Sequence, residues 1–167
     1  MEGSFVVLTG ASGAGKTTLA RFIKEHCSAI DEVLFFDSIG VPSVERMESE
    51  YGSVENWQQA MTIAWMEKIG HILRNGRRVG FEGQMRIAFV QEALTAAQIS
   101  NARIIFVDCD DVTRRRRLRT DRNQPELDNP VTMNWAAYLR KEALTTGSEI
   151  LDTGCEAFSD CVGRICS

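Results

Sequence analysis

Eight consecutive residues near the N-terminus combine glycines, a lysine and a threonine in a spacing that suits the binding of a polyphosphate. The glycines let the backbone curl so that successive N–H groups point at one phosphate. The lysine supplies a mobile cation for the β- and γ-phosphates of a nucleotide, and the threonine offers a hydroxyl to Mg²⁺. The eight residues are Gly10, Ala11, Ser12, Gly13, Ala14, Gly15, Lys16 and Thr17.

The sequence around this segment supports the same chemistry. The eight residues match G-x-x-x-x-G-K-[ST] in full, after an apolar run at 5–8 that predicts a strand and before a helix predicted from Lys16 to about His26. The helix N-terminus adds a partial positive charge. We therefore expect a phosphate-binding loop for ATP or GTP, rather than a glycine-rich turn without a ligand. Thr18 either contacts a phosphate as well or is an ordinary residue of the first helical turn.

Charged residues follow two further apolar runs. Asp37 comes after residues 33–36, and Glu82 and Arg86 come after residues 78–81. A carboxylate beside a phosphate loop can hold Mg²⁺ through water, and an arginine there can hold an anion in a forked contact. Each position also has an ordinary interpretation, as a turn aspartate or as exposed residues at a strand end.

Six arginines lie within nine positions, between residues 114 and 122. On a helix, Arg115, Arg119 and Arg122 share one face by their i, i+4 and i+7 spacing. The first four arginines are consecutive and point all round a helix, so some of them must be solvated or paired with acids. For any single arginine, the sequence leaves a functional role and a solvated role equally open.

Short apolar runs alternate with longer segments of helical periodicity along the whole chain. Strands are predicted at residues 5–8, 33–36, 78–81, 103–107 and 149–151. Helices are predicted at residues 16–26, 43–51, 54–74, 85–98, from 112, at 131–145 and at the C-terminus. This order predicts one α/β domain over residues 1–167, with a five-stranded parallel sheet between two helical layers and right-handed crossovers.

Composition limits the partners and the compartment. The chain has 167 residues, 44% of them hydrophobic and 25% charged, with a net charge of −4. That balance allows a full core, and an acidic chain is a poor candidate for bulk binding to nucleic acid. The apolar runs are too short for a membrane span. Five scattered cysteines without a C-x-x-C pair suggest a reducing cytosol and no zinc site, so we expect a cytoplasmic protein.

With these features the chain resembles the small P-loop kinases, a group that includes nucleoside-monophosphate kinases, shikimate kinase and gluconate kinase. The phosphate loop and the chain length carry the resemblance, and the N-K-x-D motif that GTPases need is missing. Residues 81–86 are similar to the D-G-x-P-R segment of adenylate kinases, with Glu82 and Arg86 at the charged positions and Met85 in place of proline. The resemblance implies a three-layer P-loop NTPase fold, a helical acceptor-site insert at about 40–76 and a lid at about 119–130.

The resemblance also implies roles for individual residues. Lys16 and Asp37 would be catalytic, with Asp37 orienting the acceptor hydroxyl or accepting its proton. The shikimate kinase pattern has a second aspartate where this chain has Ile39. Thr17 and Glu82 would hold Mg²⁺.

Two further segments would contact the nucleotide. Arg115 would stack on the adenine, and Arg119 or Arg122 would close on the transferred phosphate. A loop after the last strand would border the adenine with Asp152, Thr153 and Gly154.

The acceptor site is expected at the insert. Trp57 shares a helix face with Met61 and Trp65, an arrangement that is typical of a core and also suits a wall for a planar substrate. Neutral hydrogen bonds to the acceptor could come from Gln58, Thr62 and Gln84, and an anionic contact from Arg86.

These features together predict an ATP- and Mg²⁺-dependent kinase of a nucleoside, a nucleotide or a metabolite alcohol. Its expected partner is a small-molecule acceptor, without nucleic acid or membrane, and the chain would act as a monomer or homodimer. The alternative is an ATP-binding regulator or a slow ATPase without an acceptor.

Overall fold

The computed structural model describes residues 3–167 and contains one five-stranded parallel sheet in the order β2-β3-β1-β4-β5. The strands are β1 (Phe5–Thr9), β2 (Glu32–Phe35), β3 (Val79–Gly83), β4 (Ala102–Asp108) and β5 (Glu149–Asp152). All four neighbouring pairs are parallel, so the carboxyl ends of the strands meet along one edge of the sheet. The loops that follow these ends carry the residues selected from the sequence.

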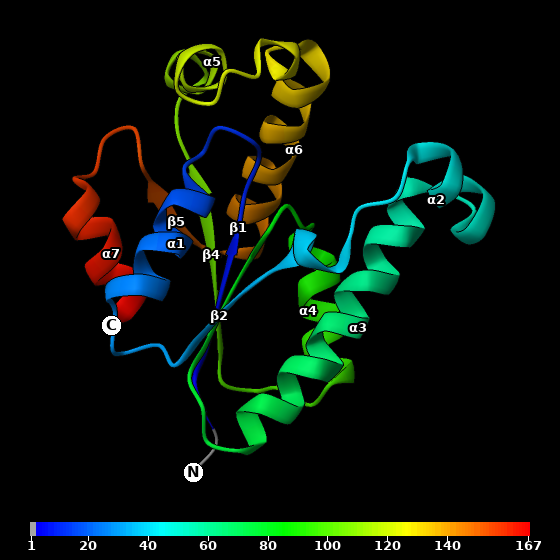
Figure 1. Cartoon of the computed structure of the whole chain (residues 1–167), viewed down its shortest axis with the longest axis vertical. Helices are drawn as coiled ribbons and strands as arrows, with labels where there is room; N and C mark the ends of the chain where they lie inside the picture. The colour runs from blue at the N-terminus through cyan, green and yellow to red at the C-terminus, as the bar shows by residue number, and fades with distance from the viewer. Residues whose placement is uncertain (1–2) are drawn as a thin grey trace.

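Helices cover both faces of the sheet (Figure 1). One face carries α1 (Lys16–His26) and α7 (Phe158–Cys166), and the other carries α3 (Val54–Arg74), α4 (Ile87–Ala96) and α6 (Pro130–Thr146). Because side chains alternate along a strand, β1 contributes to both cores. Phe5 and Val7 pack with α3 and α4, whereas Val6 and Leu8 pack with α1 and α7.

The direction of the crossovers matches this layering. The connection from β1 to β2 uses α1 on one face, and the later connections run back across the sheet over the other face. Because the crossovers that run in opposite directions across the sheet lie on opposite faces, every crossover is right-handed. The predicted three-layer P-loop fold is therefore confirmed.

The predicted insert consists of α2 (Val44–Tyr51) and α3. Ser43 and Ser53 cap these helices by accepting hydrogen bonds from the backbone N–H groups of Arg46 and Asn56. The second half of α3 packs on the sheet, while α2 projects beyond it (Figure 1). Met47 of α2 and Trp57 near the start of α3 also belong to this buried cluster, so the insert is anchored to the core along its length.

The predicted lid begins where α5 (Asp111–Arg116) widens into a π-helical turn at Arg117–Asp121. A 3₁₀ turn follows at Pro125–Leu127. Pro130 was expected in the loop, but it is the first residue of α6. The fixed φ of proline suits that position, and Asn129 caps the helix through the N–H of Thr132.

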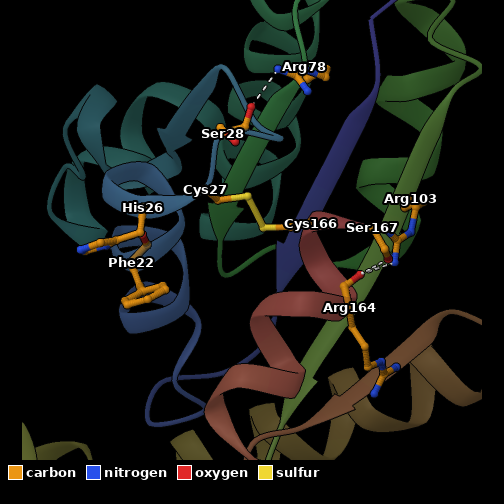
Figure 2. Close-up of a disulfide and its surroundings, with 9 residues drawn as sticks. All are labelled: Phe22, His26, Cys27, Ser28, Arg78, Arg103, Arg164, Cys166 and Ser167. Atoms are coloured by element: carbon orange, nitrogen blue, oxygen red, sulfur yellow. Dashed lines mark hydrogen bonds between the residues drawn. A yellow bond between two sulfur atoms is a disulfide. The ribbon is translucent and has the colours of Figure 1, made fainter.

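A disulfide joins Cys27, just after α1, to Cys166 in α7 (Figure 2). The two residues are 139 positions apart, so their pairing could not be seen in the sequence. It differs from the expected set of reduced cysteines. Cys109, Cys155 and Cys161 are free thiols. Across residues 3–167, none of the helices combines the length and the apolar character needed to cross a membrane.

Candidate active site

The phosphate loop links β1 to α1 at the carboxyl edge of the sheet. Gly10, Gly13 and Gly15 have φ values of 153°, 79° and 92°, which only glycine adopts without strain. A Cβ at Gly10 would also lie 2.2 Å from the carbonyl oxygen of Val107 in β4. The glycines of the motif are therefore required by backbone conformation and by close contact with the sheet.

Lys16 is buried at the start of α1, with only 4% of its surface exposed. Its Nζ donates a hydrogen bond to the carbonyl oxygen of Ala11 at 3.3 Å and lies 3.7 Å from the carboxylate of Glu82. Burial lowers the pKa of Lys16 to about 8, although the negative charge of Glu82 opposes that shift. The loop thus holds a cation that is poorly compensated until an anion arrives.

Glu82 lies within β3, next to β1, and its carboxylate points at the start of α1. The hydroxyl of Thr17 donates to this carboxylate at 3.2 Å. Burial raises the pKa of Glu82, while the nearby Lys16 lowers it. A hydroxyl oxygen and a carboxylate oxygen therefore meet beside the buried lysine.

Asp37 follows β2 in a 3₁₀ turn at Phe36–Ile39 and is exposed. Its charge contributes to raising the pKa of both Lys16 and Glu82, so Asp37 acts electrostatically on both residues. The structure thus brings Lys16, Thr17 and Glu82 into contact, with Asp37 as an exposed charge in the same region.

The turn after β3 is tied to the phosphate loop by two glutamines. Gln84 donates from Nε2 to the hydroxyl of Ser12 at 2.9 Å. Gln58 in α3 donates to the carbonyl of Gln84 at 3.1 Å and accepts from the N–H of Arg86 at 3.2 Å. Both glutamines are half-buried, and their hydrogen bonds position this turn.

The Arg86 guanidinium already has a partner. It forms an ion pair with Glu55 at 2.8 Å. Its Cζ lies 5.0–5.8 Å from the ring centroids of Phe89, Trp135 and Tyr138. An acceptor anion could use Arg86 only by exchanging with the Glu55 carboxylate.

A cavity of about 620 Å³ opens beside the phosphate loop and is large enough for a nucleotide. The loop and the first turns of α1, including Thr18, form one wall. The remainder is lined by residues of the π turn, the loop after β5 and the start of α7, namely Arg117, Asp121, Arg122, Thr153, Glu156, Phe158 and Cys161. Lys16 and Thr17 are among the residues that line this cavity.

A family model described as AAA domain matches residues 6–140. The chain belongs to the AAA domain family. The comparison with curated proteins gave no match.

Solved structures of small kinases share the fold of this AAA domain. A shikimate kinase from Acinetobacter baumannii in complex with shikimate is 18% identical, with a TM-score of 0.63 and coverage of 98% of this chain and 90% of that chain. A sugar kinase from Janibacter sp. HTCC2649 is 15% identical, with a TM-score of 0.71 and coverage of 97% and 91%. An APS kinase from Mycobacterium tuberculosis, in complex with AMPPNP and APS, is 14% identical, with a TM-score of 0.60 and coverage of 98% and 95%. The resemblance to small P-loop kinases is confirmed at the level of the fold.

Two residues selected for the acceptor site are core residues of this AAA domain. Trp57 is buried and packs edge-on against Phe36, with ring centroids 5.8 Å apart. Thr62 is fully buried, and its hydroxyl donates to the carbonyl of Gln58 within α3. The apolar face of α3 is turned to the sheet, so the prediction that Trp57 and Thr62 line the acceptor site is corrected.

The prediction that Arg115 stacks on the adenine base is also corrected. Arg115 donates to the carboxylate of Asp128 at 2.5 Å, and Arg119 forms an ion pair with the same carboxylate. Arg117 lies at the nucleotide cavity instead, donating to the hydroxyl and the carbonyl of Thr153 at 2.8 Å each. The widened turn after α5 places Arg122 at the cavity with Arg117, away from the Arg115 side.

The loop after β5 is tied to the phosphate loop and borders the cavity. The Thr153 hydroxyl donates to the carbonyl of Ala14 at 2.6 Å, which ties this loop to the phosphate loop. The Asp152 carboxylate accepts from the N–H of Gly154 at 2.8 Å and shapes the turn. Thr153 lines the cavity, while Asp152 acts on the backbone in this structure.

Arg114 is a residue of the site that was not predicted from the sequence. It has no exposed surface, and it donates to the carbonyl of Ser12 at 2.7 Å and to the carboxylate of Asp108 at 2.6 Å. One signal was available, because Leu118 follows four residues later and marks the helix face that turns inward. The consecutive arginines concealed that periodicity.

Proposed function

We propose that this protein is an ATP-dependent phosphotransferase that passes the γ-phosphate of ATP to a hydroxyl or phosphate group of a small acceptor. The observation that carries the proposal is the buried Lys16 beside Glu82 and Thr17, where Lys16 and Thr17 line a cavity of nucleotide size. A buried cation with a lowered pKa is stabilised when an anion binds next to it. The shared fold with kinases supports the same reaction class.

ATP would lie with its phosphates in the loop and its base toward α7. Backbone N–H groups of the loop and Lys16 would hold the phosphates. Arg117 and Phe158, which also line the cavity, would contact the base. The guanidinium plane and the aromatic ring both suit stacking on a purine.

Thr17 and Glu82 would hold Mg²⁺. Their hydroxyl and carboxylate oxygens are the hard ligands this ion prefers, and they lie 3.2 Å apart beside the phosphate loop. A bound Mg²⁺ would neutralise charge on the β- and γ-phosphates. It would also favour the ionised form of Glu82, against the effect of burial on that carboxyl.

The acceptor would bind on the open side of the cluster, where Asp37 is exposed. A carboxylate there can orient an acceptor hydroxyl and take its proton as the new bond to phosphorus forms. Gln58 and Gln84 would offer hydrogen bonds beside it. Arg86 would bind an anionic group of the acceptor in exchange for Glu55.

The alternative of a slow ATPase or regulator has one specific observation in its favour. Arg86 is already neutralised by Glu55, and Ile39 replaces the second aspartate of the shikimate kinase pattern. The two functions differ in whether an acceptor stimulates ADP production. ATP consumption should therefore be measured against nucleosides, nucleotides, sugars and shikimate-like alcohols, with Lys16→Ala as the inactive control. A single slow rate with every acceptor would favour the ATPase.

We expect Asp37→Asn to leave ATP affinity nearly unchanged and to lower phosphoryl transfer about 100-fold or more, because the acceptor loses its general base. Calorimetry with ATP and steady-state kinetics with the acceptor found in the screen measure the two effects. Glu48→Gln, which removes an exposed charge on α2, is the matched control and should behave as the parent. Transfer at the parent rate in Asp37→Asn would leave Asp37 as a turn residue only.

A further inference from the structure

A buried arginine contacts the backbone of the phosphate loop. Arg114 has no exposed surface and is the largest fully buried side chain of residues 3–167. Its Nη1 donates to the carbonyl oxygen of Ser12 at 2.7 Å. The side chain reaches the loop from α5, 102 residues later in the sequence.

This contact fixes the orientation of one peptide group in the loop. In a trans peptide, the C=O of one residue and the N–H of the next point in opposite directions. The Ser12 carbonyl faces the buried guanidinium, so the N–H of Gly13 faces the other way. Gly13 lines the nucleotide cavity, and its N–H is one of the groups available to a phosphate there.

Arg114 is itself held in place on two sides. Its Nη2 donates to the Asp108 carboxylate at 2.6 Å, and the same carboxylate accepts from Nε of Arg140 at 2.5 Å. Gly13 packs against the stem of Arg114, because a Cβ at Gly13 would lie 3.1 Å from the Arg114 Cγ. The guanidinium therefore has little freedom to leave the Ser12 carbonyl.

The cost of burying a charge indicates that this position does more than fill space. An apolar side chain of similar volume is often as stable as a buried ion pair or more stable. A planar guanidinium, in contrast, can donate to a carbonyl and a carboxylate at once from a fixed geometry. Asp108 is also paired with Arg140, so charge balance alone does not require Arg114.

We propose that Arg114 is a positioning residue, which orients the Ser12–Gly13 peptide so that its N–H group is ready to bind a polyphosphate. The inference rests on the proposed binding of ATP at this loop. It adds a requirement for an arginine outside the G-x-x-x-x-G-K-[ST] motif, on the far side of the loop from the nucleotide.

The test compares three variants with the parent by calorimetry with ATP and with inorganic tripolyphosphate, together with thermal melting. Arg114→Met should lower the affinity for both ligands by the same factor, about tenfold or more, because the loss concerns the phosphates and not the base. Arg114→Lys keeps the charge but not the fork, and should fall short of the parent affinity. Arg140→Met also breaks an ion pair with Asp108 without touching the loop, so it should lower the melting temperature and leave both affinities unchanged.

The results distinguish a positioning role of Arg114 from a need for its charge alone and from a purely structural role. Parent-like affinity in Arg114→Met would overturn the positioning role, and so would an equal loss in Arg140→Met. Full affinity in Arg114→Lys would show that charge alone is needed, and this comparison remains decisive if Arg114→Met does not fold. A parent protein that binds neither ligand would overturn the proposed function itself, and the inference with it.

Discussion

Lys16 combines two properties that normally exclude each other in a protein, because it is cationic and nearly inaccessible to solvent. Glu82 at 3.7 Å compensates part of the charge, yet burial still lowers the pKa of Lys16 to about 8 from 10.5. Between these pH values the unfolded chain binds more protons at this residue than the folded chain. The contribution of Lys16 to the stability of the ligand-free protein therefore rises with pH across that window.

A bound polyphosphate should raise the pKa of Lys16, because its negative charge favours the protonated lysine. We therefore expect ATP binding above pH 8 to take up a proton, with affinity falling by up to about tenfold per pH unit. Calorimetry at pH 9 in two buffers of different ionisation enthalpy measures the uptake. Lys16→Arg stays protonated and should lack it. Equal proton uptake in the two proteins would contradict the assignment to Lys16.

The residues of the site differed in how far the sequence could identify them. The phosphate loop was identified completely, because its function depends on consecutive residues whose spacing is visible in the chain. Arg114 and Arg117 could not be separated from their neighbours, because a run of arginines has no periodicity to mark the inner face. Their partners, the Ser12 carbonyl and Thr153, are distant in sequence and come close only through the sheet.

At the level of elements, all five strands were predicted, and the differences lie at their ends. β3 continues through Glu82 to Gly83, so the backbone of Glu82, which we propose as a Mg²⁺ ligand, is fixed by the ladder with β1 and not by a loop. The π turn at Arg117–Asp121 is the element that the sequence did not indicate. It explains why Arg119 points to Asp128 while Arg122 reaches the cavity.

This turn begins the segment that we expect to close over ATP. In the structure Arg119 is held by Asp128, whereas Arg122 already lines the cavity. Closure would exclude water from the γ-phosphate and bring arginine charge to the transferred group. We expect the amides of residues 119–129 to gain protection from hydrogen exchange when a non-hydrolysable ATP analogue and the acceptor are both bound.

The same closure predicts a kinetic signature. Arg122→Ala should lower turnover far more than it weakens ATP binding, since its contact would form mainly in the closed state. Arg116→Ala, which removes an exposed arginine at the end of α5 just before this segment, is the matched control and should behave as the parent. Unchanged exchange at 119–129, together with parent-like turnover in Arg122→Ala, would make the segment a static surface loop.

At the scale of the whole molecule, α1 and α7 form the layer that carries the nucleotide cavity. α1 lines the cavity with Lys16 and Thr17, and α7 lines it with Phe158. The disulfide joins Cys27 and Cys166 at the other ends of these helices (Figure 2). Buried residues of both helices share one hydrophobic cluster, so packing as well as the covalent link holds the layer together.

Reduction of the disulfide should therefore loosen the molecule without unfolding it. A cross-link that closes a long loop stabilises mainly by restricting the unfolded chain, typically by about 2–4 kcal/mol. We expect a reductant to lower the melting temperature, and Cys27→Ser to melt like the reduced parent while still binding ATP. Cys155→Ser changes an exposed free thiol and should keep the full response to reductant.

Thiol titration in denaturant should count three thiols in the oxidised protein, since five cysteines less the two of the disulfide leave three. Five titratable thiols before any reductant is added, with parent-like melting of Cys27→Ser, would show that the two cysteines are not bonded in solution.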